Sequence, residues 1–189
     1  MRFEKINYDA FKKDIIKHIF NGNGEHIDEE KIKNIYEQIK LPKRATSHSA
    51  GYDFISPVDI MITAYHAHFI PTGIKIKLDS DKMLQVVQRS SSAKNNYTLA
   101  NSIGIIDSDY YSNPDNDGDI IIALRTIPSS SVIGRIDNED LIGYTHFITY
   151  DIHAGDKIAQ GIIVPFYTVE DDDAEGDRTG GFGSTGKTI

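Results

Sequence analysis

The spacing of apolar residues divides the chain into a short helical part and a longer part made of strands. Between residues 8 and 20 the apolar residues recur every three to four positions, which predicts an amphipathic helix. A second stretch of this kind follows Asp28, a suitable N-cap, and stops at Leu41-Pro42. We interpret both helices as packing elements on the surface of the domain; a docking site for a partner protein is the less favoured alternative.

From residue 43 onward the apolar residues alternate with polar ones. Ile74, Ile76 and Leu78 are separated by lysines, which is the period-two pattern of a half-buried strand. On the same grounds, strands are predicted over residues 69–78, 83–88, 120–124, 146–150 and 158–166. Short strands at close spacing, separated by Gly, Asp, Asn and Pro, are typical of an all-β fold, either an antiparallel barrel or a sandwich.

The strand pattern ends before an acidic segment. Residues 170–177 read Glu-Asp-Asp-Asp-Ala-Glu-Gly-Asp, a run of like charges that cannot pack into a core. It is predicted to be a flexible connector to the segment that begins at Arg178. The chain therefore divides into a helical extension over 1–42, a β-barrel over 43–169 and a flexible C-terminal arm over 170–189.

Composition narrows the class of protein. The 189 residues are 39% hydrophobic and 25% charged, which suits a soluble globular protein, and they contain no run of apolar residues long enough to span a membrane. The chain has no cysteine, so disulfides and thiolate metal sites are excluded. With no signal-peptide pattern at the N-terminus, a cytoplasmic location is expected. The net charge of −8 argues against binding to duplex nucleic acid but not against a phosphorylated small molecule.

The first candidate for chemistry is the stretch Asn101–Tyr110. It is predicted to form the first arm of a β-hairpin, in which an apolar run leads to acidic and aromatic residues at the bend. Gly104 allows another group to approach the backbone closely. Asp107 follows two isoleucines, so a stiff strand should hold its carboxylate near the ring of Tyr110. An ordinary hairpin with acidic residues at its bend is the alternative.

Two further segments suit phosphate oxygens or a buried polar network. Arg89 and the three serines that follow it come directly after a predicted strand, and a guanidinium with nearby backbone amides binds phosphate through charge-assisted hydrogen bonds. Gln160 is an amide within an otherwise apolar strand and must find hydrogen-bond partners. Asp53 alone is an ordinary carboxylate near a strand end. A polar loop is the alternative for the arginine segment.

The C-terminal segment Arg178–Gly186 is the most specific local pattern. Its glycines, with Ser184 and Thr185, offer successive N–H groups to a polyphosphate, and Phe182 suits a flat partner such as a nucleobase. A disordered Gly-rich tail is the alternative.

Three motif matches are rejected. Residues 181–188 spell the phosphate-binding loop of nucleoside triphosphatases, but one residue follows, so no helix can present its N-terminus to the phosphates. Residues 113–118 look like the start of a calcium loop, but the first position is Asn and the twelfth is Leu124. His66 and His68 lack an evident third metal ligand.

Taken together, five segments in order resemble the trimeric deoxyuridine triphosphatases (dUTPases), of the Gram-positive bacterial or phage type. The matching segments are Ala50–Phe54, Arg89–Ala93, Asn101–Tyr110, Gly155–Gln160 and Arg178–Gly186. The resemblance implies a distorted antiparallel β-barrel or jelly-roll, the dUTPase-like β-clip. It also implies hydrolysis of dUTP to dUMP and pyrophosphate with Mg²⁺, by a homotrimer whose sites are shared between chains.

The resemblance assigns a role to each segment. Asp107 would activate the water that attacks the α-phosphorus, and Asp53 would act on Mg²⁺ through a bound water. Tyr110 would lie under the deoxyribose, Asn101 would read the uracil edge, and Phe182 would cap the base. The residues implied to bind the substrate are Arg89, Ser90, Ser91, Asn101, Gly104, Tyr110, Gln160, Arg178, Phe182, Gly183, Ser184 and Thr185.

Some features depart from the common family pattern. Residues 111–117 are inserted after the tyrosine, and the C-terminal segment is one residue shorter between Arg178 and Phe182, which bears on whether Arg178 reaches the phosphates. The stretch 132–144 and the N-terminal helices are additions similar to those of some Gram-positive bacterial and phage members. Two alternatives stay open: a dCTP deaminase-like enzyme, and a nucleotide-sensing regulator that binds a partner protein.

Overall fold

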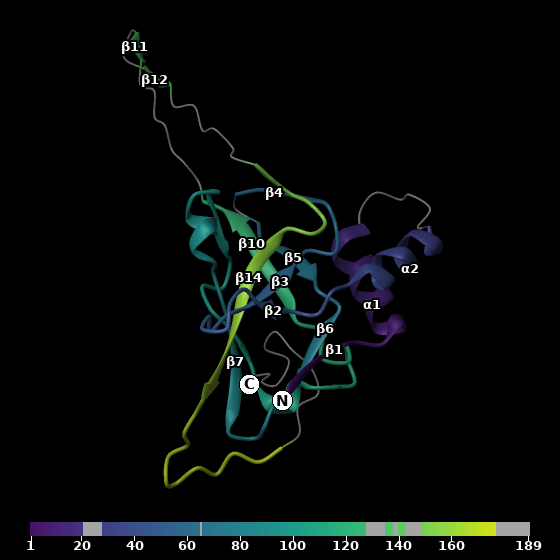
Figure 1. Cartoon of the computed structure of the whole chain (residues 1–189). Coiled ribbons are helices and arrows are strands. Elements are labelled where there is room, and N and C mark those ends of the chain that lie inside the picture. Colours follow the sequence, from purple (N-terminus) through teal and green to yellow (C-terminus); the bar gives the residue numbers. More distant parts are fainter. Residues whose placement is uncertain (21–27, 65, 128–134, 138–139, 143–148, 177–189) are drawn as a thin grey trace.

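The computed structural model describes residues 1–20, 28–64, 66–127, 135–137, 140–142 and 149–176 (Figure 1). The helices are α1 (Tyr8–Ile15), its π-helical continuation η1 (Ile16–Phe20), α2 (Glu29–Gln38) and two short 3₁₀ turns, η2 (Ser90–Ala93) and η3 (Ser108–Tyr110). The strands are β1 (Arg2–Lys5), β2 (Lys43–Arg44), β3 (Tyr52–Ile55), β4 (Ile60–Ile62), β5 (His68–Pro71), β6 (Ile74–Lys77), β7 (Lys82–Val87), β8 (Tyr97–Leu99), β9 (Gly104–Ile106), β10 (Ile121–Thr126), β11 (Arg135–Asp137), β12 (Asp140–Ile142), β13 (Tyr150–Ile152) and β14 (Lys157–Pro165).

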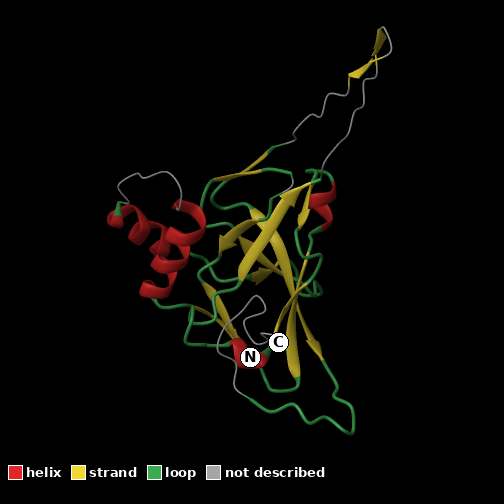
Figure 2. Ribbon diagram, turned by 180° about the vertical axis from the view of Figure 1, so that it is seen from behind, coloured by secondary structure: helices red, strands yellow, loops and turns green. Residues whose placement is uncertain are grey.

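Both predicted helices are confirmed, and their starts are set by capping side chains. The side chain of Asn7 accepts a hydrogen bond from the backbone N–H of Ala10 at the start of α1, and Asp28 accepts one from Glu30 at the start of α2. The helices lie together beside the sheets (Figure 2). No described helix is long and apolar enough to cross a membrane.

The all-β fold class is confirmed, because antiparallel strands form the body of the molecule. The largest sheet has the order β2-β3-β14-β7-β9, and a second sheet has the order β5-β10-β8. Pairs β1-β6, β4-β13 and β11-β12 complete the described strands. The strands predicted near 69–78, 83–88, 120–124 and 158–166 are present, whereas most of the strand predicted over 146–150 falls outside the described residues.

The predicted hairpin at Asn101–Tyr110 is wrong in its pairing. β9 pairs with β7, and the next strand, β10, pairs with β5 and β8 instead. After β9 the chain does not turn back at once; it forms the η3 turn and then a loop that runs to residue 120. This loop satisfies its own polar groups: the Asn113 amide donates to the carbonyl of Tyr110, and the Asn116 amide donates to the Tyr110 hydroxyl.

The N-terminal extension shares one hydrophobic core with the barrel. Phe11 and Ile15 of α1 are fully buried, in the same cluster as barrel residues such as Leu84. Gly73 makes this contact possible, because its φ is +69° and a Cβ there would lie 2.4 Å from Cδ1 of Ile39. The extension also contributes strand β1, which the apolar pattern did not predict.

Candidate active site

Three neighbouring strands bring Asp53, Arg89 and Gln160 together. β14 lies between β3 and β7, and the register places Gln160 opposite both Asp53 and Val87, two residues before Arg89. Oδ1 of Asp53 accepts hydrogen bonds from Nε of Arg89 at 3.1 Å and from Nε2 of Gln160 at 3.0 Å. Three segments that are far apart in the sequence therefore meet at one carboxylate.

Lys157 joins this cluster although it was not predicted to be a site residue. Its Nζ lies 2.7 Å from Oδ2 of Asp53, whose side chain is 5% exposed. Burial acts to raise the pKa of Asp53, but hydrogen bonds from Lys157 and Gln160 and the charge of Arg89 outweigh it, so the pKa lies below its usual value. The carboxylate stays ionised, with the cations of Arg89 and Lys157 on either side of it.

A cavity of about 350 Å³ adjoins the cluster. Arg89, Asn95 and Lys157 line it together with Tyr97 and Tyr150, whose ring centroids are 5.1 Å apart. Cationic and aromatic groups in one hollow suit an anionic ligand that also has a flat apolar part.

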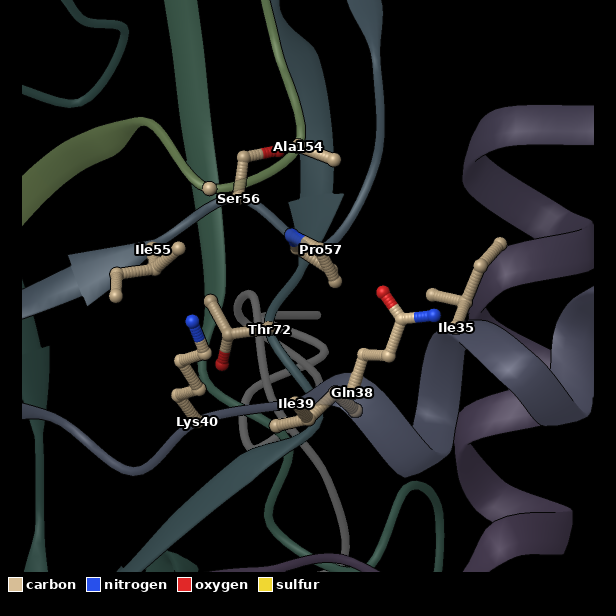
Figure 3. Close-up of a pocket in the computed structure, with 10 residues that line it drawn as sticks. Ile35, Gln38, Ile39, Lys40, Ile55, Ser56, Pro57, Thr72 and Ala154 are labelled. Carbon is tan, nitrogen blue, oxygen red and sulfur yellow. The ribbon is translucent and has the colours of Figure 1, made fainter.

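A second cavity, of about 290 Å³, lies between the C-terminal end of α2 and the segment Ser56-Pro57 (Figure 3). Ile35, Ile39 and Thr72 line it together with these residues, and it contains none of the predicted site residues. The cavity beside Arg89 is therefore the candidate active site.

The predicted catalytic aspartate lies near the other end of β7. Leu84 is opposite Ile106, and Asp107 follows Ile106 directly, whereas Arg89 is five residues beyond Leu84. Five residues of strand span about 17 Å. Asp107 and Arg89 of a single chain are thus too far apart to act on the same phosphate group.

Tyr110 is held inside the loop that follows Asp107. Its hydroxyl donates to the backbone carbonyl of Asp119 at 3.1 Å and accepts from Asn116 at 3.0 Å, and the residue is 4% exposed. Burial raises the pKa of Tyr110 to about 12. The loop holds this tyrosine in a fixed place; its contact with a deoxyribose stays a prediction.

The remaining predicted residues fall into three groups. Ser91 accepts a hydrogen bond from Nη1 of Arg89 at 3.0 Å, and Ser90 beside it is exposed. Asn101 is exposed and lies next to Gly104, where a Cβ would be 3.6 Å from its amide nitrogen. The residues predicted in the C-terminal arm lie outside the described residues: Arg178, Phe182, Gly183, Ser184 and Thr185.

Fold and site together define an all-β protein whose site holds two cations, Arg89 and Lys157, that suit a phosphorylated ligand. Comparison with known proteins identifies the family within this class. Residues 37–114 match the family model described as dUTPase. The deoxyuridine 5′-triphosphate nucleotidohydrolase of Lactococcus lactis is 35% identical over 151 residues, which cover 78% of this chain and 89% of that protein. The chain belongs to the dUTPase family.

Solved structures of the family resemble this one. The dUTPase of Streptococcus mutans superposes with a TM-score of 0.58 at 29% identity, covering 90% of this chain and 99% of that chain. A mutant dUTPase from phage phi11 of S. aureus, which coordinates a structural Mg(II) ion, superposes with a TM-score of 0.53 at 26% identity, covering 74% and 92%. The expected Gram-positive bacterial or phage type agrees with these relatives.

Proposed function

We propose that the protein hydrolyses dUTP to dUMP and pyrophosphate. The observation that carries the proposal is the cluster of Asp53, Arg89 and Gln160, which three strands assemble in a chain that aligns with 89% of a named dUTP hydrolase. A partly buried site with two cations and a neighbouring aromatic hollow suits a nucleoside triphosphate.

In this proposal Asp107 accepts the proton of the water that attacks the α-phosphorus. Aspartate is a weak base, so most of the rate acceleration comes from positioning and from neutralising charge on the triphosphate. Arg89 supplies a cation for that charge through its Nη2, and the serines after it supply hydroxyl and amide donors. Arg178 and Phe182 of the C-terminal arm would add charge on the phosphates and a cap on the base.

Mg²⁺ is the cofactor we propose for the triphosphate, where it would neutralise charge. Within the part of the chain that the structure describes, no three His, Asp or Glu side chains are grouped to hold a metal ion. Mg²⁺ commonly keeps several waters and binds substrate phosphates through one or two carboxylates, so a site with one nearby carboxylate fits it. Both oxygens of Asp53 already accept hydrogen bonds from protein groups, so Asp53 would act through a water.

We further propose that the protein is a homotrimer with shared sites. In this proposal Asp107 of one copy serves Arg89 of another, which the distance along β7 supports. β9 is the edge strand of its sheet, and Ile105 in it and Ile103 just before it are 48% and 52% exposed. Association of copies would cover this apolar edge.

A nucleotide panel tests the activity. Pyrophosphate release is measured from dUTP, UTP, dTTP and dCTP, with and without Mg²⁺. We expect release from dUTP with Mg²⁺, little from the other nucleotides, and loss of activity in the Asp107→Asn variant. Full activity of that variant would contradict the assignment of the base, and ammonia release from dCTP would favour the deaminase alternative.

A regulatory role is a second candidate, favoured by the hairpin of β11 and β12, which lies away from the sheets (Figure 1). Such a projection suits a contact with a partner protein. Pull-down with and without a non-hydrolysable dUTP analogue tests this: capture of a partner that depends on the nucleotide supports a regulator, and capture that ignores the nucleotide contradicts it.

A further inference from the structure

The pairing of β14 with β3 contains an irregularity at the active site. Gln160 is opposite Asp53 and Ala159 is opposite Phe54, but Lys157 is opposite Ile55, so the register shifts between 157 and 159. In regular pairing Ile158 would be opposite Ile55. One extra residue in β14 therefore forms a bulge at Ile158.

This bulge decides which way Lys157 points. Side chains alternate between the two faces of a strand, and directly opposed residues share a face. Without the bulge, Lys157 would lie on the face of Ala159 and Phe54, which are 0% and 1% exposed. The shift moves it to the face of Asp53, while Ile158 is buried in the core at 1% exposure.

We infer that Lys157 is a positioning residue of the active site: its ammonium fixes Asp53, and Asp53 in turn holds Arg89 and Gln160 in the orientation that binds the substrate phosphates. This inference rests on the proposed function. Each oxygen of Asp53 has its own partners: Nζ of Lys157 lies 2.7 Å from Oδ2, and Oδ1 accepts from Arg89 and Gln160.

The backbone of Lys157 adds a second link to the arginine. Nη1 of Arg89 donates to the carbonyl oxygen of Lys157 at 3.3 Å and to the hydroxyl of Ser91 at 3.0 Å. With Nε bound to Asp53, the described residues give Nη2 no hydrogen-bond partner. The guanidinium is thus held through Nε and Nη1, and Nη2 stays available to an anion.

The competing role for Lys157 is direct contact with the phosphates, and the two roles predict different couplings. A positioning residue acts through Asp53, so its removal should change phosphate binding little once Asp53 is replaced and no longer accepts these bonds. A residue that touches the phosphates itself should change phosphate binding equally whether Asp53 is intact or replaced. A double-mutant cycle separates the two.

The experiment compares Lys157→Met with Lys157→Arg, which keeps a cation for Asp53. Lys33→Met is the matched control, because Lys33 is an exposed lysine on α2. Binding of inorganic pyrophosphate is measured by calorimetry, and dUTP hydrolysis is measured in parallel. Thermal melts of all variants establish that they fold.

We expect Lys157→Met to weaken pyrophosphate binding and raise KM for dUTP on the order of tenfold, with a smaller change in kcat. Lys157→Arg should recover most of the loss, and the control should match the wild type. In an Asp53→Asn background, Lys157→Met should change binding by less than about twofold.

Two results would overturn the inference: unchanged pyrophosphate binding in Lys157→Met, or an undiminished effect in the Asp53→Asn background. Failure of the wild type to hydrolyse dUTP would instead contradict the proposed function. The pyrophosphate measurement still decides the role of Lys157 in that case, because it needs no turnover.

Discussion

Mixing two inactive variants should restore activity if Asp107 and Arg89 of different copies form one site. Asp107→Asn removes the proposed base and leaves Arg89 intact, and Arg89→Ala does the reverse. Because about 17 Å of β7 separates the two residues within a chain, each site needs an intact Asp107 from one copy and an intact Arg89 from its neighbour.

The size of the recovery follows from random assembly. In an equal mixture, half of the chains carry an intact Asp107 and half carry an intact Arg89. About one quarter of the sites in a closed symmetric oligomer then combine both, so the mixture should reach about a quarter of wild-type activity. If one chain supplied both residues to its own site, every site would be defective and the recovery would be zero.

The assay is pyrophosphate release from dUTP after co-expression of the two variants with different affinity tags. Sequential purification on both tags isolates the mixed oligomers and shows that exchange has occurred. In a trimer each mixed oligomer has one intact site in three, so this purified fraction should reach about a third of wild-type activity. Each variant alone, treated in the same way, gives the background. Mixed oligomers that stay at background would refute the placement of the two residues on separate chains.

Three further outcomes are expected. Burial raises the pKa of Asp14 above its usual value of 3.8, so the folded protein loses stability as pH rises from that value through the raised pKa. Asp14→Asn should therefore be stabilised more, relative to the wild type, at pH 8 than at pH 4, and an equal difference at both pH values would contradict this. A Cβ on Gly51 would lie 3.0 Å from Cδ of Gln160, so Gly51→Ala should displace that amide. We expect kcat/KM to fall about tenfold with little change in melting temperature, and unchanged kinetics would contradict the predicted steric contact. Leu84 is fully buried, so Leu84→Ala should lower the free energy of unfolding in urea by about 2–5 kcal/mol, and a loss near zero would place Leu84 outside the core.

Local patterns predicted those parts of the fold whose residues interact with near neighbours or with a core. The helix stripe around Phe11 and the cap at Asp28 are local signals, and both helices formed as expected. The apolar run that begins at Ile158 is the longest strand, β14, at the centre of the largest sheet. The meeting of Asp53, Arg89 and Gln160 agrees with their assignment to one family site.

Pairing partners were harder to predict, because they depend on which distant strand is adjacent. The hairpin expected after Asp107 followed from sequence proximity, yet β9 pairs back onto β7. Lys157 was missed for a related reason. Strict alternation from Gln160 places it on the core face, and only the register of β3 reveals the bulge that moves it. A lysine at a position that alternation assigns to the core was the signal that could have found it.

The N-terminal extension gains a role from what it touches. The backbone N–H of Asn7 donates to Asp117 at 2.7 Å, Lys13 forms an ion pair with Asp115, and Lys75 of β6 forms an ion pair with Asp117 at 2.9 Å. All of these partners lie in the loop that begins after Asp107. Contacts from the extension add to the loop's own hydrogen bonds and to the ion pair with Lys75, and together they limit its freedom. The extension and β6 therefore anchor the middle of the insertion that follows the proposed base.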